Sequence, residues 1–149
     1  MKATDRIPVG ASATKSWVVT KELTIARRDD RLPPVFATPM MIYLMEIASA
    51  EAIQSYLPEG WLSVGVLVNV KHLAPTPVGA TVTARAEVIA VTDSSVTFAV
   101  EAYDGVEKIG EGTHVRVPVE LERFLKRVRS KTTPPTLLEP GGNCSAQMQ

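Results

Sequence analysis

One apolar stretch with the marks of a helix, followed by four stretches of strand-like alternation, limits the folds open to this chain. The helix is predicted from Thr38 to about Tyr56, because Thr is a favourable N-cap and Pro39 suits a first helical position. The Pro- and Gly-containing segment 57–60 ends it. Its first half is apolar around most of its circumference, which is typical of a helix enclosed by other structure. Alternating apolar residues then predict four strands, over residues 61–73, 80–92, 96–103 and from the Asp104-Gly105 turn to about 119.

A further strand is predicted before the helix, from Ser16 to Ile25, where Val, Thr and Ile are abundant. A strand, a buried helix and four strands joined by short turns predict an α+β fold, with one antiparallel sheet wrapped around one long central helix. A short amphipathic helix is expected over residues 119–131. One helix covers only one face of the sheet and leaves strand edges open, so we expect a homodimer, or a tetramer built from two dimers.

The length of 149 residues suits a single folded domain. We expect that domain over residues 14–130, between a loose N-terminal segment, 1–13, and a disordered tail, 131–149, that is rich in Pro and Gly. Sixteen acidic residues balance sixteen basic ones, so we expect neither nucleic acid nor a membrane as a partner. A single cysteine, Cys144, and the lack of an apolar leader or a bilayer-spanning segment favour a cytoplasmic protein.

Glu46 lies in the middle of the most apolar part of the predicted helix. A carboxylate is rarely buried without a partner, so Glu46 is a candidate active-site residue. Thr38 lies about two turns earlier and can point along a similar line. In an unbulged strand, alternation aims His72 at the helix together with the apolar residues Leu62, Val64, Val66, Val68 and Val70. A hydroxyl, a carboxylate and an imidazole that converge on one apolar cavity predict a general-base or nucleophile site for acyl chemistry.

Each of these residues also has a purely structural interpretation. Glu46 could be a core carboxylate tied to a backbone amide or to an arginine. Thr38 could serve only as an N-cap, and His72 could simply hydrogen-bond a carbonyl group. His114 alternates away from the apolar residues of its strand, and we interpret it as structural or near an entrance. Without a second His or Cys near Glu46 and His72, no metal site is expected.

Three segments resemble the fluoroacetyl-CoA thioesterase-like branch of the hotdog-fold superfamily: Val35-Phe-Ala-Thr-Pro-Met-Met-Ile-Tyr-Leu-Met-Glu46, the run from Gly65 to Gly79, and Gly110-Glu-Gly-Thr-His-Val-Arg116. The resemblance covers most of residues 14–130. It implies a hotdog fold built from dimers, with active sites at the subunit interface. It also implies hydrolysis of a small acyl-CoA thioester to the free acid and CoA, without a cofactor, since CoA is part of the substrate.

By the same resemblance, Thr38, Glu46 and His72 correspond to the family's catalytic threonine, glutamate and histidine. Gly65 corresponds to a glycine whose backbone N–H lies near the thioester carbonyl. Arg116 corresponds to an arginine near the bound CoA or acyl group. Whether the glutamate acts as nucleophile or as general base stays open at this point.

Phe36 lies in the matching motif and is expected to contact the substrate. The volume of the acyl pocket is expected to depend on a small set of side chains, Leu32, Phe36, Met40 and Tyr43. The fluoroacetyl-CoA specialist carries phenylalanines just before this motif, whereas residues 28–34 here hold no aromatic residue, so selectivity for a fluorinated acyl group does not follow. Two alternative functions are a hotdog enoyl-CoA hydratase or dehydratase and a non-catalytic acyl-CoA-binding module.

Overall fold

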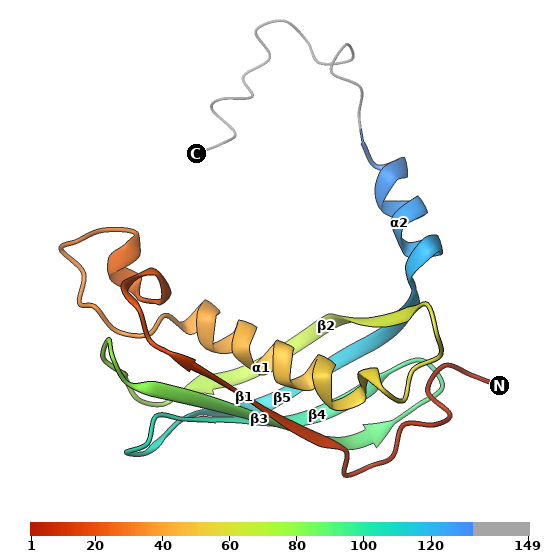
Figure 1. The fold of residues 1–149 in the computed structure, drawn as a ribbon, viewed down its shortest axis with the longest axis horizontal. Coiled ribbons are helices and arrows are strands. Elements are labelled where there is room, and N and C mark those ends of the chain that lie inside the picture. The colour runs from red at the N-terminus through yellow and green to blue at the C-terminus, as the bar shows by residue number, and fades with distance from the viewer. Residues whose placement is uncertain (133–149) are drawn as a thin grey trace, which may run out of the picture.

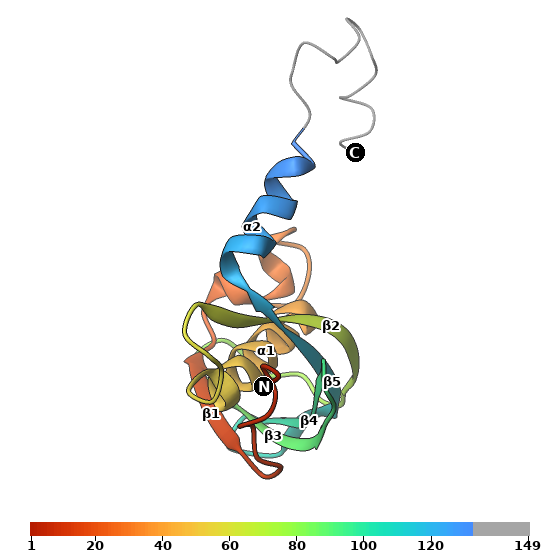
Figure 2. The same ribbon diagram turned by 90° about the vertical axis from the view of Figure 1, so that its right-hand side faces the viewer.

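Five antiparallel strands form one curled sheet that wraps around a single long helix in the computed structural model, which describes residues 1–132 (Figure 1). The strands lie in the spatial order β1-β3-β4-β5-β2. Their bounds are β1 (Ser12–Val18), β2 (Trp61–His72), β3 (Thr81–Val91), β4 (Val96–Tyr103) and β5 (Lys108–Glu120). The helix, α1 (Thr38–Gln54), lies in the hollow of the sheet, as the end-on view in Figure 2 shows. The predicted α+β architecture is therefore confirmed.

The core lies between α1 and the concave face of the sheet. Alternate residues of β3 and β4 are buried, which is the period expected of strands with one face covered. These residues are Val82, Ala84, Ala86 and Val88 in β3, and Val96, Phe98, Val100 and Ala102 in β4. The buried face of α1 opposes them with Met41, Leu44, Met45, Ala48 and Ile53. Three of these buried residues are alanines, whose small side chains leave room for the helix to approach the sheet closely.

The first strand differs from its prediction. β1 ends at Val18, and two single-turn 3₁₀ helices follow it, η1 (Lys21–Leu23) and η2 (Ile25–Arg27). The predicted strand from Ser16 to Ile25 is therefore correct only for residues 16–18 and wrong for residues 19–25, and the actual strand begins earlier, at Ser12. The hydroxyl of Thr24 donates to the carbonyl of Lys21 at 2.7 Å, a local bond that competes with strand pairing.

The two ends of the described chain pack differently. Near the N-terminus, Ile7 is buried and the hydroxyl of Thr4 donates to the carbonyl of Thr92 at 2.7 Å. After β5, the predicted short helix is present as α2 (Leu121–Ser130) and projects away from the sheet (Figures 1 and 2). Residues 133–149, nearly all of the predicted tail, lie outside the described residues. Up to residue 132, no helix has the length and apolar character needed to cross a membrane.

A bulge in β2 changes which side chains face the helix. Gly65 pairs with Arg116, and Leu67 with Val115, so Val66 is an extra residue on its strand. Residues opposite each other in an antiparallel pair share a face, so the inward face of β2 carries Ser63, Gly65, Val68, Val70 and His72. The prediction is correct for Val68, Val70 and His72. It is wrong for Leu62 and Val64, because it assumed a strand without a bulge.

β2 lies at one edge of the sheet, and only β5 pairs with it within the described chain. Val66, Leu67 and Val68 on this edge are 58, 50 and 42 % exposed. An exposed apolar edge strand offers unpaired backbone groups to another strand.

Candidate active site

The first cluster of polar groups joins the start of α1 to the end of β2. Thr38 Oγ1 lies 2.7 Å from His72 Nδ1. The N-cap of α1 is Ala37, and no side chain caps this end, so the interpretation of Thr38 as an N-cap is wrong. Pro39 still explains why the helix begins here, since its fixed φ and missing N–H suit the first turn. The Thr38 hydroxyl is thus free to bond the imidazole.

His72 is poised as a neutral proton acceptor. Its Nε2 atom is buried and has no hydrogen-bond partner within residues 1–132. Burial lowers the pKa of His72, and the nearby backbone of Ala74 opposes this only in part. A neutral imidazole at physiological pH, with one nitrogen held and the other unpaired, is what general-base chemistry requires.

The Thr38–His72 pair lines a cavity of about 350 Å³. Phe36 also lines it, although this ring is itself almost fully buried in the core. The remaining lining residues are apolar: Ile25, Val35, Leu73, Ala74 and Pro75. Thr38 itself is exposed and His72 is half-buried, so the pair lies where a substrate can reach it, while Nε2 of His72 is shielded from water.

Glu46 lies in a separate place, over the bulge of β2. A Cβ atom added to Gly65 would lie 2.6 Å from Glu46 Oε2, so only glycine leaves room for this carboxylate. Glu46 Oε2 is 3.8 Å from Arg116 Nη1 and 4.0 Å from His114 Nε2, and the side chain is 36 % exposed. Within one protomer, Glu46 is therefore a carboxylate that lies beside an arginine, as its structural interpretation expected. The structure joins Thr38 to His72 but does not bring Glu46 into contact with them.

Arg116 and His114 form the floor beneath Glu46. Arg116 is 7 % exposed and donates from Nε to Ser63 Oγ and from Nη2 to the Ser63 carbonyl, both at 2.8 Å. His114 Nε2 lies 3.1 Å from Arg116 Nη1, and His114 Nδ1 lies 2.8 Å from the Leu67 carbonyl. Burial lowers the pKa of His114, and the adjacent guanidinium lowers it further.

His114 is therefore an interior residue and does not lie at an entrance. Its ring stacks on Phe98 with centroids 6.2 Å apart. The spacing of His114 and Arg116, two residues apart in a strand, was the signal that they share a face. Nothing in the sequence indicated that Ser63 joins them, because that contact depends on how β2 and β5 pair.

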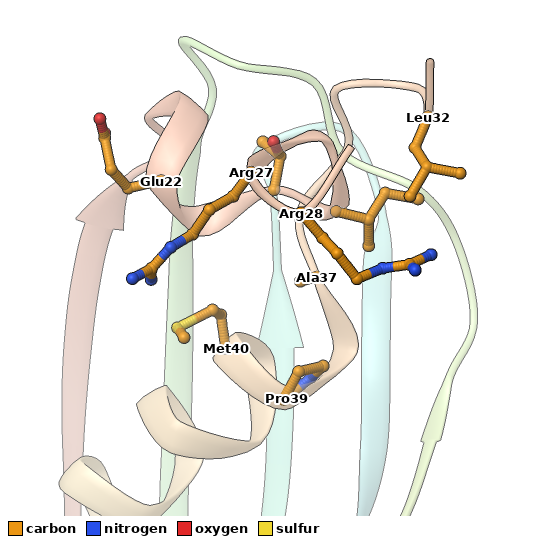
Figure 3. Close-up of a pocket in the computed structure, with 9 residues that line it drawn as sticks. Glu22, Arg27, Arg28, Leu32, Ala37, Pro39 and Met40 are labelled. Carbon is orange, nitrogen blue, oxygen red and sulfur yellow. The ribbon is translucent and has the colours of Figure 1, made fainter. Parts of the chain in front are cut away.

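A second cavity, of about 480 Å³, lies between the 3₁₀ segment and the start of α1. Figure 3 shows Arg27 and Arg28 across the cavity from Pro39 and Met40 of the helix, with their guanidinium groups pointing to opposite sides. Its other lining residues are Glu22, Thr24, Ile25, Leu32 and Ala37. Leu32 and Met40, two residues expected to shape the acyl pocket, line this cavity. Tyr43 does not; it is 53 % exposed and packs edge-on against Trp17.

Metal chemistry has no evident ligand set in the described part of the chain. No group of three or more His, Cys, Asp or Glu residues there is arranged to hold an ion.

The curled sheet around a central helix, with an imidazole–hydroxyl pair and a carboxylate on its inner side, defines a thioester hydrolase of the hotdog fold. The model of the family described as "Fluoroacetyl-CoA-specific thioesterase" matches residues 19–122. The chain belongs to this family, which confirms the resemblance and the prediction of an acyl-CoA thioesterase. The match favours hydrolysis over the hydratase and binding-module alternatives.

Known relatives agree with this assignment. The fluoroacetyl-CoA thioesterase of Streptantibioticus cattleyicolor is 40% identical over 134 residues, which cover 86% of this chain and 96% of that protein. A solved structure of the fluoroacetyl-CoA thioesterase FlK superposes with a TM-score of 0.81 at 39% identity, covering 87% of this chain and all of that one. A hot-dog-like protein from Thermanaerovibrio acidaminovorans gives a TM-score of 0.79 at 28% identity, covering 90% and 99% of the two chains. The predicted hotdog fold is confirmed.

Proposed function

We propose that two copies of the chain complete each active site for acyl-CoA hydrolysis, with Thr38 and His72 of one copy facing Glu46 of the other. The separation of the two clusters carries this proposal. Thr38 and His72 are joined at 2.7 Å. Glu46 lies two turns further along α1, about 12 Å away along the helix axis at 1.5 Å per residue. In a dimer, the Glu46 carboxylate of one copy can lie near the His72 imidazole of the other copy without any change in either cluster.

The open edge of β2 is the surface for that dimer. Its apolar run, Val66 to Val68, is the kind of edge that pairs with another strand. A two-fold, antiparallel pairing about this run sets the His72 end of one β2 opposite the Ser63 end of the other. Glu46 lies over Gly65, close to that second end. The same symmetry forms two identical sites.

The reaction breaks the carbon–sulfur bond of the thioester and yields the free acid and CoA. With Glu46 as base, the carboxylate takes a proton from the attacking water; with Glu46 as nucleophile, it forms a mixed anhydride that water then cleaves. Thr38 holds Nδ1 of His72, and the free Nε2 accepts the proton that Glu46 or the attacking water gives up and passes it to the leaving thiolate, so that Glu46 and His72 both return to their starting states. The backbone N–H of Gly65 donates to the developing oxyanion, a role that its bare Cα leaves accessible.

The thioester carbonyl lies at Thr38 and His72, and the acyl group extends from their cavity into the 480 Å³ cavity beside the start of α1, which shares Ile25 with it. Apolar side chains of Ile25, Leu32 and Met40 line this larger cavity, and the charged residues Glu22, Arg27 and Arg28 lie around it. Because residues 28–34 contain no aromatic side chain, the cavity accepts acyl groups beyond fluoroacetyl. Its size suits short and branched chains, which gain affinity by burying apolar surface.

Release of free thiol from a panel of short, branched, aromatic and halogenated acyl-CoA thioesters tests this function. The wild-type protein is expected to hydrolyse several of them, and His72→Ala to lower kcat/KM by roughly 10²–10⁴. Tight acyl-CoA binding without thiol release over hours would contradict the proposal. Interconversion of enoyl-CoA and 3-hydroxyacyl-CoA without thiol release would identify a hydratase instead.

We also place the reaction in the cytoplasm. The support is the single cysteine, Cys144, since a chain without an internal cysteine pair suits a reducing compartment.

A further inference from the structure

A buried polar cluster beneath Glu46 goes beyond the three proposed catalytic residues. Its members are Ser63 from β2 and His114 and Arg116 from β5. All three are buried, with exposed fractions of 7, 1 and 7 %. Burying a charged group or an imidazole costs free energy unless its hydrogen bonds are satisfied. A hydrogen-bonded cluster of such groups in a core therefore suggests a functional role.

The guanidinium of Arg116 is held from three directions. Nε donates to Ser63 Oγ and Nη2 donates to the Ser63 carbonyl, each at 2.8 Å. Ser63 therefore binds one edge of the planar guanidinium group. Nη1 donates to His114 Nε2 at 3.1 Å and lies 3.8 Å from Glu46 Oε2. With its other two nitrogens bound to Ser63, Arg116 presents Nη1 to the carboxylate.

The contacts of His114 fix its tautomer. Arginine only donates hydrogen bonds, so Nε2 of His114 must accept and cannot carry a proton. Nδ1 then carries the proton and donates to the Leu67 carbonyl at 2.8 Å. A doubly protonated ring would place an N–H against the guanidinium and lose this bond, in line with the lowered pKa of His114. Leu67 follows the bulge at Val66, so the bulge supplies the carbonyl that orients the ring.

We propose that Ser63, His114 and Arg116 are a positioning unit that holds the Glu46 carboxylate in place for hydrolysis. The inference rests on the proposed function of Glu46, and it gives Arg116 a different task from the substrate contact that the family resemblance implies. The distances of 3.8 and 4.0 Å to Glu46 Oε2 are longer than direct hydrogen bonds, so the unit attracts the carboxylate without locking it. Glu46 then keeps the freedom to meet water or the thioester.

A matched pair of substitutions separates the two contacts of His114. In His114→Gln, the amide oxygen reaches about the position of Nε2 and accepts from Arg116. In His114→Asn, the amide reaches only the position of Nδ1 and leaves Arg116 without this acceptor. We expect His114→Gln to keep kcat within about 3-fold and His114→Asn to lower it by about 10-fold, with KM unchanged in both. Equal losses in the two variants would contradict the positioning role.

A second pair tests Arg116 itself. Arg116→Met removes the charge and is expected to lower kcat by about 10–100-fold without raising KM, because the lost contact is to Glu46 and not to the substrate. Ser63→Ala removes one anchor and is expected to lower kcat by about 3–10-fold, again without a change in KM. A raised KM for acyl-CoA at constant kcat would overturn the proposal and make Arg116 a substrate-binding residue.

The tautomer can be measured in the wild-type protein, even where a core variant fails to fold. The chain has only two histidines, so ¹⁵N-histidine labelling gives two ring systems, and the spectrum of His72→Gln assigns them. We expect His114 to be neutral at pH 7, with its proton on Nδ1. A proton on Nε2 would overturn the proposal. This result is independent of hydrolysis, whereas a wild-type protein that releases no thiol would refute the proposed function alone.

Discussion

The two polar clusters on the inner side of the sheet differ in how they are held. The Thr38–His72 pair lies at the junction of a helix start and a strand end, lines a cavity and leaves Nε2 of His72 unpaired within the described chain. The cluster of Ser63, His114 and Arg116 is buried between two paired strands, with its hydrogen bonds satisfied. In our proposal the first cluster meets the substrate, and the second holds one side chain, Glu46, near the open edge of the sheet.

Loss of the Glu46 carboxylate should have the largest effect on activity. It removes the group that the cluster of Ser63, His114 and Arg116 holds, and it leaves the Thr38–His72 pair intact. Glu46→Gln is expected to lower kcat/KM for a good acyl-CoA substrate by roughly 10²–10⁴, as for a general base or nucleophile. Its thermal denaturation midpoint should stay near that of the wild type, since Glu46 is 36 % exposed. Near wild-type hydrolysis by this variant would reduce Glu46 to a structural ion-pair partner.

The hydroxyl of Thr38 should matter through its bond to His72. Thr38→Val keeps the shape of the side chain but loses the contact at 2.7 Å, and we expect kcat to fall by about 10–100-fold. Thr38→Ser keeps the hydroxyl and serves as the matched control, with a loss of less than about 5-fold. Steady-state kinetics of the two variants provide the comparison, and equal activities would remove Thr38 from the site.

Activity should be sensitive to the addition of a single methyl group at Gly65. A Cβ atom there would lie 2.6 Å from Glu46 Oε2 and 2.9 Å from His114 Cε1, so Gly65→Ala must displace the carboxylate. We expect kcat to fall by about 10-fold with little change in KM. Val64→Ala, on the opposite face of the same strand, is the control and should retain activity. Full activity of Gly65→Ala would show that the position of Glu46 is not critical.

The smallest expected effect is on stability at mildly acidic pH. The pKa values of His72 and His114 are both lowered from 6.5, chiefly by burial, so the unfolded chain binds these protons more readily than the folded one. The stability that the neutral rings contribute is therefore present above about pH 6.5 and is lost as the pH falls toward the lowered folded values. Denaturant unfolding between pH 7.5 and 5 should show this decline, and His114→Asn should weaken it. A stability that rises as the pH falls through this range would contradict the burial of neutral imidazoles.

Local periodicity predicted much of the fold, and long-range pairing determined the rest. The helix from Thr38 and the strands after it follow from residue spacing alone, and α1 begins at the predicted residue. The bulge at Val66 could not be predicted, because it depends on the pairing of β2 with β5, and it reverses the face of Leu62 and Val64. The early end of β1 likewise reflects a turn stabilised by Thr24.

In the candidate site, too, the sequence predicted the individual residues but not the long-range contacts between them. The sequence and the family resemblance singled out Thr38, Glu46 and His72, and the structure joins the first and third at 2.7 Å. The surroundings of Glu46 depend on contacts between strands that are far apart in the chain, 53 residues in the case of Ser63 and Arg116. No local pattern reveals such a contact.

Mixing two inactive variants tests the shared active site most directly. Homodimers of Glu46→Gln and of His72→Ala are each expected to be nearly inactive. After mixing in equal amounts, dissociation and reassociation, half of the dimers should carry one variant of each kind. In each mixed dimer one of the two sites then holds an intact set of Thr38, Glu46 and His72, so the mixture should regain about a quarter of wild-type activity. A mixture that exchanges subunits and stays inactive would contradict a site shared between two copies.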